Sequence, residues 1–206
     1  MKKLLLFTAF TFLFSNINIA QELSFGAKLG VNFASISNSD SETKGRTSFH
    51  LGAVAEYAIT DKFSGQAELL YSGMGAKTEF SDEDGSFEGK TKLSYISLPL
   101  LGKYYVTEAL SVEAGPQFSF LISAEDEFTA TYEDFNGETE TESGTEDIKD
   151  GISGFDFGFG IGGTYKLENG IFFSLRYVLG LSKLAANGDG KNKNNVFQIS
   201  GGYKFN

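Results

Sequence analysis

The residues of this chain that could carry out chemistry are few, and the only histidine, His50, comes first among them. A hydrolase or acyltransferase needs a general base beside a nucleophile and a carboxylate, and Ser48, Ser64 and Glu68 could supply these groups around His50. A lone histidine in a polar interior more commonly only hydrogen-bonds its neighbours. Both interpretations stay open, and the second is favoured.

Two glycine-containing segments resemble nucleotide-binding loops. Gly158, Gly160 and Gly163 have the G-x-G-x-x-G spacing of a dinucleotide turn, and residues 84–91 (DGSFEGKT) end like a phosphate-binding loop. The first motif needs a following helix, but alternating large and small residues continue through it and predict a strand. The second lacks its first glycine. We therefore expect no cofactor, and we expect the glycines to leave space that Arg176 or Lys103 fills from the opposite wall.

The segment 124–151 holds the densest charge, with 11 acidic residues and a single lysine. Divalent cations prefer carboxylate oxygens, so such cations, or cation-bridged contact with lipopolysaccharide, could bind here. A charge-dense, solvated loop is the simpler interpretation. The aromatic residues Phe128, Tyr132 and Phe135 interrupt the acids, which indicates that part of the segment extends its neighbouring strands as a hairpin.

Residues 1–20 have the layout of a secretory signal peptide, with Lys2 and Lys3 before the apolar run Leu4–Phe14. We expect its removal to leave residues 21–206 as one exported domain. That domain has 15 basic and 27 acidic residues, which argues against binding to nucleic-acid phosphates. The chain has no cysteine, which excludes disulfides and thiolate metal sites.

Period-two alternation runs through the remainder of the chain. In Phe25–Phe33 the odd positions are large or apolar and the even positions are small or polar. Successive side chains of a strand point to opposite faces, so this pattern predicts strands with one apolar face. Eight such segments are expected, at residues 25–33, 49–59, 63–71, 91–106, 110–123, 152–167, 171–184 and 195–205.

The connections between these segments alternate in length. Short turns are expected at 60–62, 107–109 and 168–170, and long polar loops at 37–46, 80–90, 124–151 and 185–194. Outer-membrane barrels have short periplasmic turns and longer extracellular loops. The sequence therefore predicts an all-β fold, an eight-stranded antiparallel up-and-down transmembrane β-barrel.

The two faces of the expected barrel are assigned by size. An eight-stranded barrel has an interior only just wide enough for side chains, so the small and polar face fits inside and the bulky face meets lipid. Charges of both signs fall on the inner face and predict an ion-pair network in a plugged lumen, although several lie near strand ends and could meet water instead. They are Lys28, Glu56, Glu68, Lys103, Glu113, Asp156, Arg176 and Lys204.

Three segments carry a family resemblance. Residues 93–106 (LSYISLPLLGKYYV), residues 110–122 (LSVEAGPQFSFLI) and the opening Phe25–Asn32 resemble the PorT-like outer-membrane β-barrel family common in Bacteroidetes. The resemblance implies an eight-stranded barrel in the cell outer membrane and, for one branch, a part in protein export. The chain departs from many such barrels in ending on Asn206, with the aromatic Phe205 penultimate; recognition by the barrel-assembly machinery is still expected.

The expected function is that of a non-enzymatic, monomeric outer-membrane barrel with acidic extracellular loops. It would act in surface interaction, in envelope structure or in support of a secretion assembly, with outer-membrane lipid and lipopolysaccharide around it. The first alternative is a narrow channel for ions or small solutes. A weaker alternative is an outer-membrane lipid hydrolase that uses His50.

Overall fold

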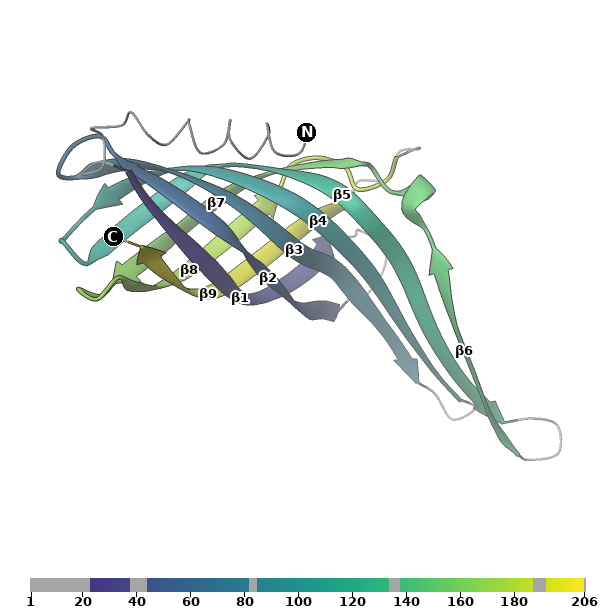
Figure 1. Ribbon diagram of the computed structural model, residues 1–206. Coiled ribbons are helices and arrows are strands. Elements are labelled where there is room, and N and C mark those ends of the chain that lie inside the picture. Colours follow the sequence, from purple (N-terminus) through teal and green to yellow (C-terminus); the bar gives the residue numbers. More distant parts are fainter. Residues whose placement is uncertain (1–22, 38–43, 82–84, 134–137, 187–191, 206) are drawn as a thin grey trace, which may run out of the picture.

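The computed structural model describes residues 23–37, 44–81, 85–133, 138–186 and 192–205, and Figure 1 shows that they form almost entirely strands. The expected signal peptide lies outside the described residues. No helix in the described part of the chain is long and apolar enough to cross a membrane. The elements are β1 (Leu23–Ser37), β2 (Lys44–Ala58), β3 (Phe63–Ser81), β4 (Gly85–Tyr105), β5 (Leu110–Glu133), β6 (Thr139–Asp147), the 3-10 turn η1 (Lys149–Gly151), β7 (Phe155–Lys166), β8 (Ile171–Gly180) and β9 (Lys193–Phe205).

Eight of the described strands close into a ring. The sheet runs in the order β4-β3-β2-β1-β9-β8-β7-β5-β6, and a further pairing of β4 with β5 closes it. Every pairing is antiparallel. Strand β6 pairs only with the outer part of β5, and so it lies outside the ring. The predicted eight-stranded up-and-down barrel is confirmed.

The two ends of the barrel differ. The start of the first strand and the end of the last strand lie at one end, where Phe25 pairs with Phe205. The short turns lie at the same end, and in one of them Gly170 has φ +88, a conformation that glycine adopts without strain. Its amide donates to the Leu167 carbonyl at 3.1 Å, which confirms the tight turn expected at 168–170. By the usual asymmetry of outer-membrane barrels, this end is periplasmic.

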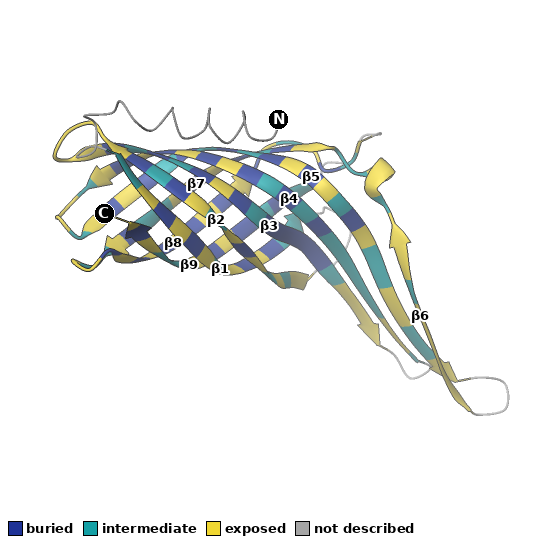
Figure 2. Ribbon diagram, viewed as in Figure 1, coloured by how far each residue is buried: buried dark blue, intermediate teal, exposed yellow. Residues whose placement is uncertain are grey.

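Burial alternates residue by residue along the barrel strands, as Figure 2 shows. The outward side chains are apolar and exposed, as a lipid-facing surface requires. Aromatic rings pair near both ends of this surface, in the two belts that membrane barrels place at the interfaces. Toward the short turns the pairs are Phe63–Tyr104 and Tyr203–Phe205, and toward the opposite end they are Phe33–Phe197, Phe49–Tyr71 and Phe120–Phe155.

Two predicted loops are largely strands. The segment 80–90 was expected to be a long loop, but β3 continues to Ser81 and β4 begins at Gly85. In 124–151, β5 continues to Glu133 and pairs with β6, which confirms the expected hairpin. The prediction of a loop at 80–90 was wrong because the segment is mostly polar or charged, and its two apolar residues, Phe80 and Phe87, are too few to give a clear period-two signal. Strand β8 is shorter than the expected segment 171–184 and ends at Gly180.

The glycine motif at 158–163 is part of the barrel wall. It lies inside β7, which runs on to Lys166 and is followed by a turn and another strand instead of a helix. A Cβ on Gly160 would lie 3.3 Å from Cδ of Arg176, so the side chain of Arg176 occupies the space that the glycine leaves. Arg176 comes from the neighbouring strand β8, however, and not from the opposite wall as expected.

Because the outer face of the barrel is assigned to lipid, the free energy that a charged substitution costs should depend on its position along the barrel. Leu29 is 65% exposed on the outer surface between the two aromatic belts, and Leu29→Arg should destabilise the barrel by about 2–4 kcal/mol, the cost of arginine near the bilayer midplane. Ile59 is 63% exposed at a short turn, and Ile59→Arg should cost about 0–1 kcal/mol. Urea unfolding of both variants in phospholipid vesicles measures the two costs. Equal costs would contradict the assignment.

Candidate functional site

A buried arginine lies between two carboxylates at the centre of the lumen. The Arg176 guanidinium donates to both oxygens of Glu68, at 2.8 and 2.7 Å, and its Nε and Nη2 donate to Oε1 of Glu113 at 2.9 and 2.6 Å. All three side chains are at most 1% exposed. The fork of an arginine suits such bidentate pairing, and the carboxylates in turn satisfy most of its donors.

A second group of buried charges surrounds Glu56, nearer the short turns. Its Oε2 accepts from Lys103 at 2.9 Å and from Lys204 at 2.5 Å. Its Oε1 accepts from the Ser64 hydroxyl at 2.9 Å and also from the Tyr105 hydroxyl. Four donors from three strands, β3, β4 and β9, therefore meet one carboxylate, and so the charge is removed from water without being left unpaired.

The two groups form one connected network. Lys103 lies 3.9 Å from Glu113, which links the Glu56 group to Arg176, and Lys28 lies 3.4 Å from Glu68. The structure thus brings together seven of the eight charges predicted to line the lumen. Asp156 does not join them: it accepts from Ser182 at 2.5 Å and from Asn194 at 3.3 Å. Sequence reasoning missed the neutral partners of the network, although their inward phase on the strands was a usable signal.

His50 belongs to a separate, neutral polar layer. Its Nδ1 lies 2.7 Å from Oδ1 of Asn32, and its Nε2 lies 2.9 Å from Oγ of Ser200. Asn32 uses its amide nitrogen to donate to Ser72 and Gly73, at 3.0 and 2.8 Å, so its oxygen is left to accept from His50. Nε2 of His50 then accepts a hydrogen bond from the Ser200 hydroxyl.

Ser200, His50 and Asn32 are linked in the order that a hydrolase uses: a nucleophile, its general base and a group that orients the base. His50 and Asn32 are 0% exposed and Ser200 is 4% exposed, and Ser200 pairs on both sides within the sheet. All three side chains are therefore buried in the barrel interior. The expected neighbours Ser48 and Glu68 bond elsewhere, to the Gly73 carbonyl and to Arg176.

Ser64, the third neighbour expected around His50, also bonds elsewhere, donating to Glu56. None of the three groups proposed for a hydrolase therefore contacts His50. The two that do contact it, Asn32 and Ser200, lie on the strands β1 and β9. They share the inward phase with His50, but the sequence pattern did not show which inward residues face one another across the ring.

An apolar layer closes the lumen at the end opposite the short turns. Its buried members are Ala34, Met74, Leu93, Tyr95, Leu121, Ala124, Val178, Leu184 and Val196, with Ile36, Ile148 and Ile152 packed against them. The segment around η1 is held over this layer: the amide of Ile148 donates to the Ala124 carbonyl at 3.0 Å, and the amide of Ser153 donates to the Leu184 carbonyl at 2.8 Å. The interior is therefore stacked in charged, neutral polar and apolar layers.

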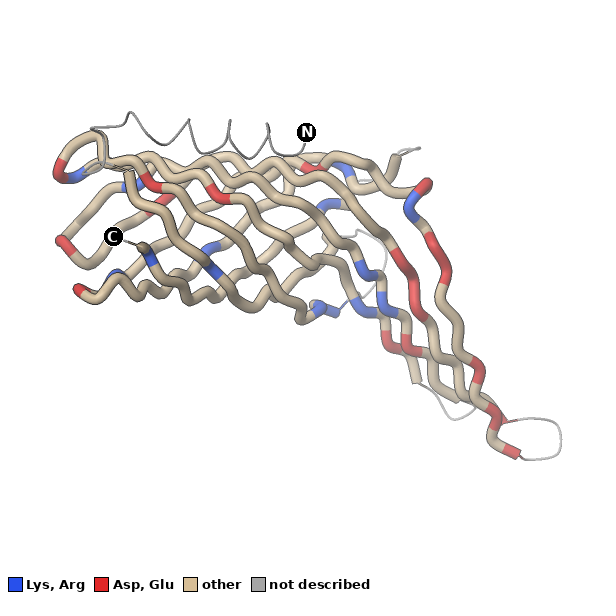
Figure 3. The backbone as a smooth tube through the Cα atoms, viewed as in Figure 1, with Lys and Arg blue, Asp and Glu red and all other residues tan. Residues whose placement is uncertain are grey.

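Beyond the apolar layer, four strands continue as an arm (Figure 1). We define the arm as residues 77–81, 85–92, 125–133 and 139–147, which pair as a sheet in the order β3-β4-β5-β6. It holds three lysines against ten acidic residues, and Figure 3 shows these charges gathered on it while the barrel wall carries few. At ~3.3 Å per residue, the nine residues of β5 in the arm extend the arm about 30 Å beyond the barrel.

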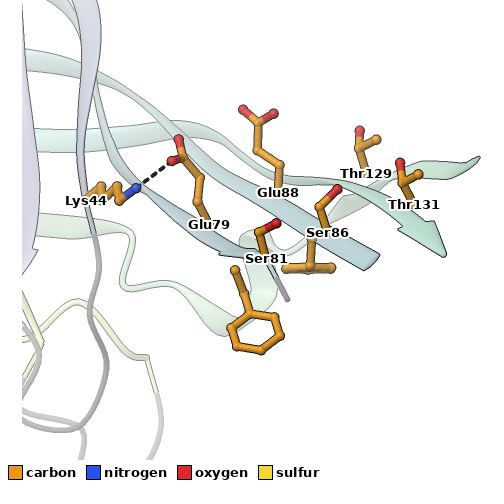
Figure 4. Close-up of a pocket in the computed structure, with 9 residues that line it drawn as sticks. Lys44, Glu79, Ser81, Ser86, Glu88, Thr129 and Thr131 are labelled. Carbon is orange, nitrogen blue, oxygen red and sulfur yellow. Dashed lines mark hydrogen bonds and ion pairs between the residues drawn. The ribbon is translucent and has the colours of Figure 1, made fainter. Parts of the chain in front are cut away.

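The two faces of the arm differ in chemistry. One face bears exposed carboxylates and hydroxyls over a shallow groove of about 450 Å³, shown in Figure 4, where the labelled Ser81, Ser86 and Glu88 lie on the same side of the sheet. The other face continues the inner wall of the barrel. It carries aromatic rings that no lipid covers: Phe80, Phe87, Phe128 and Tyr132 are 61%, 41%, 36% and 42% exposed.

Ion pairs between neighbouring strands hold the base of the arm. Lys44 donates to Glu79 at 2.7 Å, and Lys92 pairs with Glu127. These hydrogen bonds hold the pKa of Glu79 and the pKa of Glu127 below the usual range of a glutamate. Both pairs therefore persist as the pH falls until it reaches those lowered values.

Metal binding at the acidic segment 124–151 stays a prediction. Among the described residues, no three acidic or histidine side chains converge as a metal site would require. The acids of β5 and β6 are divided between the two faces of the arm, with Asp126, Glu140, Glu142 and Glu146 on one face and the others on the opposite face.

Comparison with known proteins agrees with this architecture. A family model described as an outer membrane protein beta-barrel domain matches residues 19–186. The chain belongs to this family. The fold and the family place it in the outer membrane, and no curated protein matches it.

Solved structures of outer-membrane barrels resemble the chain in fold. Ail, the attachment invasion locus protein of Yersinia pestis, is 15% identical with a TM-score of 0.51, and the match covers 89% of this chain and 99% of Ail. Neisserial surface protein A is 13% identical with a TM-score of 0.44, over 87% of this chain and 95% of that protein. At such identities the likeness is one of fold alone.

The central arginine generates a stability prediction. Arg176→Met should lower the free energy of unfolding by about 3–5 kcal/mol, because Glu113 and Glu68 stay buried after their main partner is lost. Adding Glu113→Gln should recover part of this loss. Lys62→Met, at an exposed turn, should change stability by no more than about 0.5 kcal/mol. Denaturant unfolding in lipid vesicles measures all three, and an Arg176→Met cost equal to that of Lys62→Met would contradict the network's role.

Proposed function

We propose that this protein is a closed, non-enzymatic outer-membrane barrel that acts through its arm, as a contact surface for partners outside the cell. One observation carries the proposal: four aromatic rings, of Phe80, Phe87, Phe128 and Tyr132, are exposed on a sheet that extends beyond the lipid-facing belts. Apolar rings kept in water are typical of interaction sites. Their position away from the membrane favours a protein or glycan partner over lipid.

The filled interior supports a scaffold more than a channel. Ions crossing the barrel would have to displace the Arg176 pairs, the His50 layer and the apolar layer in succession. Each layer contains fully buried side chains, and the apolar one offers an ion only the Tyr95 hydroxyl, which already accepts from Asn194, in place of its hydration. A conducting state would require rearrangement of all three layers.

The burial of His50 and Ser200 supports a non-enzymatic role for the same reason. Their hydrogen bonds satisfy polar groups inside a narrow barrel, as a structural filler does. We also propose that the chain belongs to the PorT-like branch, on the residues quoted above, and that it acts as a monomer surrounded by outer-membrane lipid and lipopolysaccharide. Envelope structure and support of a secretion assembly are compatible with a partner-binding arm.

Purified protein in planar bilayers should give no single-channel current steps. The reason is the apolar layer, which closes the outer end of the lumen. A matched variant tests this reason: Leu93→Asp places a charge in that layer, at a residue that is 0% exposed, and should produce leak currents if it folds. Regular current steps from the unaltered protein would contradict the closed barrel and favour the channel.

Photo-crosslinking in intact cells tests the contact surface. A benzophenone side chain in place of Phe87 or Tyr132 should capture a protein or glycan, because both positions are exposed on the arm. The same group in place of Phe173, on the lipid-facing wall, or Asp61, at a short turn, serves as the matched control. Adducts no more abundant from the arm than from the controls would contradict the proposed function.

A further inference from the structure

We propose that the free edge of β6, Thr139–Asp147, pairs with an extended, Lys- or Arg-rich strand of a partner protein. The inference rests on the proposed function, since it names the part of the arm that binds and the chemistry of what it binds. The binding mode is addition of a strand to a sheet edge, in which main-chain hydrogen bonds supply affinity and alternate side chains supply specificity.

The edge is open along the whole strand. Among the described residues, β6 is the last strand of the sheet and pairs only with β5, from Glu133↔Thr139 to Glu125↔Asp147. Every second residue of such a strand directs its amide and carbonyl groups away from its one neighbour, and these groups are a template for another chain. Figure 1 shows β6 along the outer margin of the arm. In the part of the chain that the structure describes, the opposite edge of the arm offers only the short end of β3, residues 78–81.

The side chains of β6 select the charge of the partner. The strand reads TETESGTED, with four acidic residues and no basic one, and every residue except Gly144 is exposed. A second copy of the chain pairing edge to edge would bring carboxylates against carboxylates, which is destabilising. Charged edges of this kind prevent self-association. A strand with lysine or arginine at alternate positions meets no such repulsion and pairs with the acids instead.

The aromatic face of the arm adds a second point of recognition. The Phe128 ring lies over Gly144 of β6, where an added Cβ would be 2.6 Å from its Cε1. The Tyr132 hydroxyl donates to Glu140 at 3.3 Å, and the neighbouring carboxylate raises the pKa of Tyr132. The two rings thus lie beside the acidic edge, on the face that also carries Glu142. A lysine or arginine of an added strand would meet both a carboxylate and the face of a ring.

A labelled single cysteine reports occupation of the edge. The chain has no cysteine of its own, so Thr145→Cys on β6 and Ser81→Cys on the β3 edge each give one site for a fluorophore. Full-length protein in lipid nanodiscs is titrated with a ten-residue peptide that alternates lysine and valine. Binding should saturate and change the signal at Thr145→Cys but not at Ser81→Cys.

Two comparisons separate strand pairing from simple charge attraction. The same peptide with alternate backbone amides methylated keeps its charge but cannot pair on one edge, and should bind at least about tenfold more weakly. Neutralising the edge by E140Q, E142Q, E146Q and D147N together should also weaken binding about tenfold, whereas E79Q with E88Q on the other side of the arm should not. Heat-modifiable gel mobility checks that each variant is folded.

Four results would overturn the proposal even if the peptide binds: equal binding of the methylated peptide, a signal at Ser81→Cys instead of Thr145→Cys, saturation of the signal by calcium alone, or self-association of the protein without peptide. Failure here is distinguishable from failure of the proposed function. If benzophenone at Phe87 or Tyr132 captures a partner but the peptide does not bind, the edge proposal fails and the contact surface stands. If neither occurs, both fail.

Discussion

The pairing of Arg176 with Glu68 and Glu113 is the constraint on which the barrel interior depends. A charge removed from water costs several kcal/mol unless partners replace its hydration, and a lumen this narrow holds few waters. The arginine meets this condition by bonding carboxylates from two other strands. Because its side chain fills the space beside Gly160, the adjacent strand must be small there. Gly160 is therefore a consequence of the ion pair, whereas Gly158 leaves room for the side chain of Val178.

The interior and the arm differ in how far their side chains find partners. Inside, layers of paired charges, hydrogen-bonded neutral groups and apolar side chains fill the barrel. Among the described residues only four buried side-chain atoms, of Gln117, Ser174, Asn194 and Gln198, have no hydrogen-bond partner. Outside, Phe80 and Phe128 remain exposed and the acids of β6 have few cations near them. The unsatisfied surfaces of the molecule thus lie on the arm, and its function is proposed there.

Alternation of side chains was sufficient to predict the barrel, its strand number and the inward residues, since lipid on one side and a narrow lumen on the other leave a period-two signal. It was insufficient in the arm, where both faces meet water, as in residues 77–81 and 85–92. The position of a residue in the period-two pattern also shows only that its side chain points inward. Which side chains contact one another across the lumen depends on the register between the strands around the barrel. The partners of His50 and the separation of Asp156 from the network therefore could not be predicted from the sequence.

Accessibility of the lumen tests the closed interior most directly. Ser97 is 0% exposed in the middle of the barrel, where it bonds Ser119 at 2.8 Å, and a cysteine there would be the only thiol of the chain. In nanodiscs, Ser97→Cys should resist a small water-soluble methanethiosulfonate reagent for a time that labels Ser81→Cys completely. Labelling of both positions at similar rates would mean that water fills the lumen, and would contradict the account.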